Sequence, residues 1–106
     1  MWSVLYYSSR VRREIEVWPV GVYADFLRLV ECLEVYGLDL RMPHSRAMSG
    51  GLFELRCRGR EGIGRVFYCT QRGRELVILH SFVKKTQATP DREIKLARSR
   101  LKEVQR

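Results

Sequence analysis

The stretch Phe53-Glu54-Leu55-Arg56-Cys57-Arg58 alternates apolar and charged side chains. Successive side chains of a β-strand point to opposite faces, so this alternation predicts a strand with one charged face. Turn residues at 59–62 and 72–73 separate it from two further predicted strands, residues 63–70 and 75–82. The last strand begins with a continuous apolar run, which predicts a central position with both faces covered. We therefore expect a three-stranded antiparallel meander.

Helical patterns flank this meander. After a short predicted strand at residues 3–7, apolar residues recur at helical spacing over 11–18 and again over 20–36, which predicts a helical hairpin. After the sheet, we expect Thr89 to cap a C-terminal helix that has Pro90 at its first position. The sequence thus predicts an α+β fold, with an N-terminal strand and a helical hairpin packed on a small antiparallel sheet, and a C-terminal helix.

The composition of the 106 residues fits one folded domain, which we expect to span residues 1–106. A hydrophobic fraction of 45% argues against disorder, and the absence of a long apolar stretch argues against a membrane span. The formal net charge is +8, and all of this excess lies in residues 54–106. Such asymmetry suggests a polyanionic partner, either a nucleic acid or an acidic protein.

Most known catalytic motifs are absent from the chain. It has no P-loop, no dinucleotide-binding glycine fingerprint, no H-E-x-x-H and no G-x-S-x-G. Cys32, Cys57 and Cys69 lack C-x-x-C spacing, so we expect small buried apolar residues and neither a disulfide framework nor a zinc site. The N-terminus does not resemble a signal peptide, which predicts a cytoplasmic protein. We expect no cofactor.

What the sequence does offer is a set of cations that should converge on the sheet. Guanidinium groups can hold a phosphate by paired hydrogen bonds and stabilise its transition-state charge, while aromatic rings stack on unpaired bases. A nuclease metal site needs clustered carboxylates, and only Glu54 lies among the cations, so we expect a metal-free reaction with the substrate's own 2′-OH as nucleophile. The expected cations are Arg46, Arg56, Arg58, Arg65, Lys84 and Lys85. We expect Tyr68, His80 and Phe82 to lie between these cations.

Two of these residues are the most informative. A neutral His80 is the side chain best suited to proton transfer near pH 7, and Glu54 could orient or replace it, although a structural role for His80 at the edge of the core is equally consistent with the pattern. In the predicted strand, Arg65 is at an alternate position to apolar residues and so points to the same face as they do. An arginine on an apolar face is costly unless its charge meets a partner such as Glu54 or an anion. Tyr68 points to the opposite face of the strand from Arg65, which favours a position in the core.

Three sequence elements carry a resemblance to a known family. They are Gly-Leu-Phe-Glu-Leu-Arg at 51–56, Gly-Arg-Val-Phe-Tyr at 64–68, and Leu-His-Ser-Phe-Val-Lys-Lys-Thr-Gln-Ala-Thr-Pro at 79–90. In this order and at these spacings they resemble the RelE/HigB-type toxins of bacterial type II toxin–antitoxin systems, in particular the phage-derived branch. The resemblance spans nearly the whole chain and implies the RelE fold.

The resemblance also implies an activity and partners. It implies a ribosome-dependent endoribonuclease that cleaves mRNA in the A site, leaves a 2′,3′-cyclic phosphate and a 5′-hydroxyl, and is silenced by a cognate helix-turn-helix antitoxin, which would also set the oligomeric state. Arg56, Arg65, Lys84 and Lys85 match the family's catalytic cations. RelE has a catalytic tyrosine at the start of its terminal helix, where this chain has Thr-Pro-Asp-Arg at 89–92. The general base therefore stays open between the three residues His80, Glu54 and Tyr68.

Two alternatives share the same scaffold or the same charges. ParE-type toxins have this fold and act on DNA gyrase without cutting RNA. A nuclease-dead module whose cations follow a phosphate backbone would carry the same charge excess. The clustered Arg, Lys and His residues favour the endoribonuclease.

Overall fold

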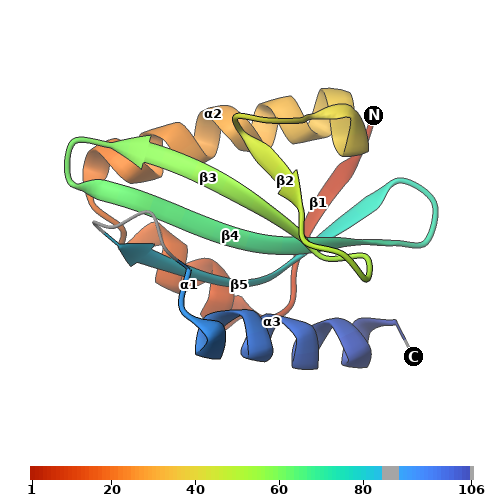
Figure 1. The fold of residues 1–106 in the computed structure, drawn as a ribbon. Coiled ribbons are helices and arrows are strands. Elements are labelled where there is room, and N and C mark those ends of the chain that lie inside the picture. Colours follow the sequence, from red (N-terminus) through yellow and green to blue (C-terminus); the bar gives the residue numbers. More distant parts are fainter. Residues whose placement is uncertain (85–88, 106) are drawn as a thin grey trace.

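The computed structural model describes residues 1–84 and 89–105, which form a mixed sheet with helices on both faces (Figure 1). The sheet has five strands in the order β1-β5-β4-β3-β2. The strands are β1 (Ser3–Tyr6), β2 (Ser45–Ala47), β3 (Phe53–Gly59), β4 (Gly62–Gln71) and β5 (Glu75–Lys84). The helices are α1 (Ser9–Glu16), α2 (Val20–Tyr36), a 3-10 turn η1 (Gly37–Asp39) and α3 (Asp91–Val104). This α+β architecture confirms the predicted fold class and is compatible with a RelE-like fold.

The sheet contains the predicted meander and extends it on both sides. Strands β3, β4 and β5 pair antiparallel, as the alternation at 53–58 and the two turns predict. The N-terminal strand β1 joins β5 in parallel, with Ser3 opposite Glu75, so the sheet is mixed. Strand β2 pairs antiparallel with β3 and forms the other edge. The central strand β4 therefore lies between two long partners.

The helices divide the core between the two faces of the sheet. Helices α1 and α2 cover one face, and α3 packs against β4 and β5 on the other (Figure 1). Because α3 brings only a narrow apolar stripe, centred on Ala97 and Leu101, it covers part of its face. Residues 76–81 of β5 are buried, which confirms that the apolar run is covered on both sides.

A β-bulge decides which face His80 occupies. The register of β4 on β5 passes from Phe67↔His80 to Tyr68↔Ile78, so Leu79 is an extra residue in β5. Without the bulge, Ile78 and His80 would share a face because side chains alternate. With it, Ile78 packs in the core beneath α1 and α2, whereas His80 lies beside Phe67 on the α3 face.

The cap observed for α3 differs from the predicted one. Helix α3 begins at Asp91, and its N-cap is Pro90, whose side chain makes no cap hydrogen bond. The expectation that Thr89 caps α3 is therefore wrong: its hydroxyl donates a hydrogen bond to Glu54 Oε2 at 2.9 Å. The N-cap of α2 is Pro19, which provides no side-chain hydrogen bond. The first turn of α2 is capped instead by the β3–β4 turn, where the carboxylate of Glu61 accepts a hydrogen bond from Gly21 N–H.

The burial of the cysteines and the lengths of the helices test two further predictions, that the cysteines are buried and that no segment spans a membrane. Cys57 and Cys69 are buried as expected, and Cys32 is half-buried. Burial raises the pKa of Cys57, and it raises that of Cys69 to about 11. In the described part of the chain, no helix has the length and apolar character needed to cross a membrane.

Candidate active site on the sheet

The sheet register brings four of the predicted site residues together. Glu54 of β3 lies opposite Arg46 of β2 on one side and Phe67 of β4 on the other. Two residues further along β3, Arg56 lies opposite Arg65 of β4. Side chains at directly opposite and alternate positions share a face of a sheet, so all four polar residues face the α3 side.

Glu54 is the centre of this group. Its Oε1 accepts hydrogen bonds from Arg46 Nη2 at 3.2 Å, Arg56 Nε at 3.2 Å and Arg65 Nη1 at 3.3 Å. Its Oε2 accepts the hydroxyl of Thr89, and the carboxylate is fully buried. Three guanidinium groups around one carboxylate leave an excess of two positive charges, and we call this group the arginine cluster.

The three arginines differ in their access to solvent. Arg65 is 0% exposed, and burial, reinforced by repulsion from its arginine neighbours, lowers its pKa against the opposing attraction of Glu54. This contact confirms that the buried arginine has Glu54 as a partner. The side chains of Arg46 and Arg56 are 41% and 16% exposed. An incoming anion would therefore meet Arg46 and Arg56 first, with Arg65 behind the carboxylate.

His80 lies on the same face and is held from two directions. Its Nε2 is 2.6 Å from Glu93 Oε1 in the first turn of α3. Its ring lies beside those of Phe67 and Phe82, with centroids 6.3 Å from each. The other ring nitrogen, Nδ1, is buried and has no hydrogen-bond partner among the described residues. Buried polar atoms without partners are rare in native proteins and call for an explanation.

The other candidates lie apart from the arginine cluster or outside the described residues. Tyr68 is fully buried on the opposite face, where its hydroxyl is 2.5 Å from Ser45 Oγ and burial raises its pKa. Its parity predicted this position. Arg58 is exposed near the end of β3, and Lys84 is the last residue of β5, both on the face of the arginine cluster. Lys85 lies outside the described residues.

Two residues of the site escape the sequence argument. Thr89 lies just before the N-cap of α3 and Glu93 lies in the first turn of this helix. They contact Glu54 and His80, respectively, across 35 and 13 residues of chain. Their positions near a helix start have an ordinary explanation, capping for threonine and the helix dipole for glutamate. The only sequence signal for a second role is that they follow the Lys-Lys-Thr element of the family resemblance.

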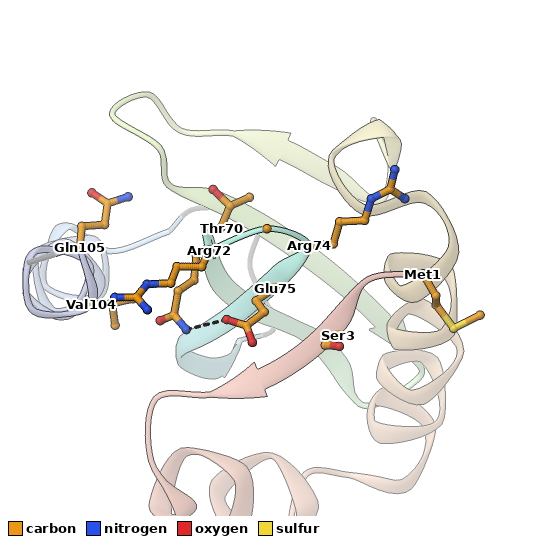
Figure 2. A pocket seen from close by; sticks show the side chains of 10 residues that line it. Met1, Ser3, Thr70, Arg72, Arg74, Glu75, Val104 and Gln105 are labelled. Carbon is orange, nitrogen blue, oxygen red and sulfur yellow. Dashed lines mark hydrogen bonds between the residues drawn. The ribbon is translucent and has the colours of Figure 1, made fainter.

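The surface also contains a hollow away from this site. A hollow of about 950 Å³ lies between the β4–β5 turn, β1 and the C-terminal end of α3. Figure 2 shows the side chains that line it. Its two arginines, Arg72 and Arg74, are exposed, and its carboxylate, Glu75, accepts a hydrogen bond from Gln71 at 2.9 Å. None of the predicted site residues that the structure describes lines it. The site is therefore defined by side-chain convergence and lies at the other end of β5.

The charges of the site determine what it can bind. Over residues 1–84 and 89–105, no three His, Cys, Asp or Glu side chains gather as metal ligands do. The arginine cluster instead offers guanidinium donors and positive charge, which suit a phosphate or another oxyanion. Phe82, half-buried beside His80, adds an aromatic surface of the kind on which nucleobases stack.

One comparison identifies relatives of this chain. The family model described as "Phage derived protein Gp49-like" matches residues 13–102. This family is associated with the toxins of toxin–antitoxin systems. No curated protein matches the chain. The matched region contains every described residue of the arginine cluster together with His80 and Glu93.

Proposed function

The chain belongs to the Gp49-like family of phage-derived proteins, and from this premise we propose that it is the toxin of a type II toxin–antitoxin system that cleaves mRNA on the ribosome. A cognate helix-turn-helix antitoxin would hold it inactive. The RelE/HigB type of activity, the ribosome and the mRNA substrate all belong to this proposal.

The observation that carries the proposal is the arginine cluster. Keeping three guanidinium groups around one buried carboxylate is costly, because like charges repel and desolvation penalises each ion. A site that must receive a phosphodiester gains from that excess charge, since charge increases on the phosphate in the transition state. Arg46 Nε, which is buried and has no hydrogen-bond partner among the described residues, is a further donor for such a ligand.

The proposed reaction is an attack by the 2′-oxygen on the adjacent phosphorus. The new O2′–P bond forms as the P–O5′ bond breaks, which leaves a 2′,3′-cyclic phosphate and a 5′-hydroxyl. Arg46 and Arg56 hold the phosphate oxygens, and Arg65 adds its charge from behind Glu54. The excess positive charge would repel a divalent cation, so we propose that the reaction uses no metal ion.

The two protons of this reaction need separate groups. Both oxygens of Glu54 already accept hydrogen bonds, so Glu54 is better suited to arranging the arginines than to removing a proton. His80 is our proposed base for the 2′-OH proton, and the ammonium of Lys84, on the same face, is our proposed donor to the departing O5′. Tyr68 packs on the other face and receives no role.

The test is expression of the protein and its variants in bacteria. We expect the wild type to stop growth and to shorten translated mRNAs, as seen by mapping of 5′ ends. Arg56→Ala should lose cleavage by about 10²–10³-fold, the usual effect of removing one donor to a developing oxyanion. The matched control is Arg10→Ala, which removes an exposed arginine on α1. Growth arrest with intact transcripts would refute the endoribonuclease, and trapped gyrase–DNA complexes would then favour the ParE-like alternative.

A further inference from the structure

His80 and Glu93 form a pair that the proposed reaction does not yet explain. Their contact joins β5 to the first turn of α3, at 2.6 Å between Nε2 and Oε1. Both side chains are largely buried, with 11% of His80 and 17% of Glu93 exposed. A short hydrogen bond at this depth fixes the position of the ring more firmly than a surface ion pair would.

The chemistry of the pair decides which ring nitrogen carries the proton. An ionised carboxylate can only accept a hydrogen bond, so Nε2 must be the donor. A neutral imidazole carries one proton, and a proton on Nε2 leaves the lone pair on Nδ1. Nδ1 is the ring atom that is buried without a hydrogen-bond partner among the described residues.

We infer that Glu93 is a positioning residue that holds His80 in the Nε2–H tautomer and thereby makes Nδ1 the proton acceptor of the site. The inference rests on the proposed function, because it assigns the 2′-OH of the RNA as the group that Nδ1 meets. The 2′-OH proton passes to Nδ1 as the O2′–P bond forms. His80 then carries protons on both nitrogens, and the carboxylate of Glu93 stabilises that cation.

The surroundings support this assignment. His80 lies beside the arginine cluster across β4, because Phe67 is opposite both His80 and Glu54 in the register. The ring of Phe67 is nearly parallel to the imidazole, at 9°, which restricts how the imidazole can turn. The β-bulge at Leu79 is what brings His80 to this face. A histidine with only a packing role would gain nothing from a buried acceptor that has no partner among residues 1–84 and 89–105.

The tautomer can be measured without any assay of activity. The chain has two histidines, so His44→Gln leaves His80 as the only imidazole and its ¹⁵N signals are assigned at once. Two-bond ¹H–¹⁵N spectra distinguish a protonated from an unprotonated ring nitrogen. Recorded over a pH series until the ¹⁵N shifts stop changing at the alkaline end, they should show His80 protonated on Nε2 alone.

Variants of Glu93 then test the positioning role. Glu93→Ala removes the acceptor and should give a mixture of tautomers. It should also lower cleavage by about tenfold or more, up to the roughly 10²–10⁴-fold that a proton-transfer group itself contributes. Glu93→Gln keeps an acceptor oxygen and should restore the Nε2–H tautomer in part, with a smaller loss. Asp91→Asn is the matched control, since it removes an exposed carboxylate from the same helix turn. Circular dichroism of each variant shows whether it is folded.

The outcomes separate this inference from the proposed function. Cleavage by the wild type together with an Nδ1–H tautomer of His80 would overturn the inference. So would Glu93→Ala with mixed tautomers and an unchanged cleavage rate. A wild type that cleaves no RNA would instead overturn the proposed function. Wild-type cleavage, an Nε2–H tautomer and parallel losses of both in Glu93→Ala would establish Glu93 as the positioning residue.

Discussion

Replacing Glu54 by glutamine tests the physical basis of the site. Three guanidinium groups contact the carboxylate, and one of them, on Arg65, has no exposed surface. Removing one partner of a buried ion pair typically costs about 3–5 kcal/mol, because the remaining charge stays buried. Glutamine keeps an acceptor oxygen, so we expect about 3 kcal/mol. For a domain whose free energy of unfolding is about 5–15 kcal/mol, that is a large fraction.

Urea unfolding of the purified proteins measures this cost. The midpoint should fall with an unchanged slope, and the melting temperature should fall by about 12 °C or more for a chain of this size. Inorganic phosphate should stabilise Glu54→Gln more than the wild type, because the arginine cluster then lacks its internal anion. Glu14→Gln is the control, since Glu14 forms an exposed pair with Arg10 on α1 and should change stability by less than about 1 kcal/mol.

A Glu54→Gln variant as stable as Glu14→Gln would contradict this expectation. The buried guanidinium groups would then not depend on the carboxylate, and the arginine cluster would have no need of an anion. Greater stability of Glu54→Gln than of the wild type would contradict the reasoning more strongly.

Three further predictions follow from exposure and pKa. Arg46→Ala should weaken cleavage about 10²-fold but change the free energy of unfolding by less than about 1 kcal/mol, because its side chain is 41% exposed. Cleavage rates and urea unfolding of the same variant check this. A loss of stability large enough to unfold the variant, which would itself account for the lost cleavage, would contradict it. Thiol reagents should modify Cys32 in the native protein while sparing the buried Cys69, which a thiol titration would show. Burial raises the pKa of Cys69 from 9.0 to about 11, so the contribution of its neutral thiol to the free energy of unfolding is complete below pH 9 and is lost as the pH rises to 11. Alkaline melting curves would show this loss. Hydrogen bonds from backbone N–H groups, its own and that of Gly21, lower the pKa of Glu61, so Glu61→Gln should lower the melting temperature at pH 7, and this difference should shrink as the pH falls below the ordinary value of 4.5.

The sequence predicts the fold well because the fold depends on local patterns. The alternation at 53–58 and the turns that follow predict the meander, and the apolar run in β5 predicts that this strand lies inside the sheet, where it is found between β1 and β4. The parallel pairing of β1 with β5 could not be predicted from these patterns, since nothing in a short apolar strand specifies its partner. The β-bulge at Leu79 was also hidden, because a continuous apolar run carries no parity.

The candidate site was predictable only where strand parity applies. Parity correctly placed Tyr68 in the core and indicated that Arg65 needs a partner such as Glu54. Strand alternation could not reveal that Arg65 has no exposed surface. Because Arg46 and Arg56 are more exposed, they are better placed than Arg65 to meet a ligand. The contacts made by α3 also depend on how a helix docks on a sheet, which the local sequence does not encode. The catalytic assignment of all these residues stays a prediction.

The central claim is that the arginine cluster holds a phosphodiester of mRNA during 2′-OH attack. The most direct measurement is in vitro translation of a defined mRNA with and without the purified protein, followed by analysis of both new RNA ends. We expect cleavage within the translated region, with a 2′,3′-cyclic phosphate on one fragment and a 5′-hydroxyl on the other, and loss of both products in Arg56→Ala. Fragments with a 5′-phosphate and a 3′-hydroxyl, or mRNA that stays intact while translation stops, would contradict it.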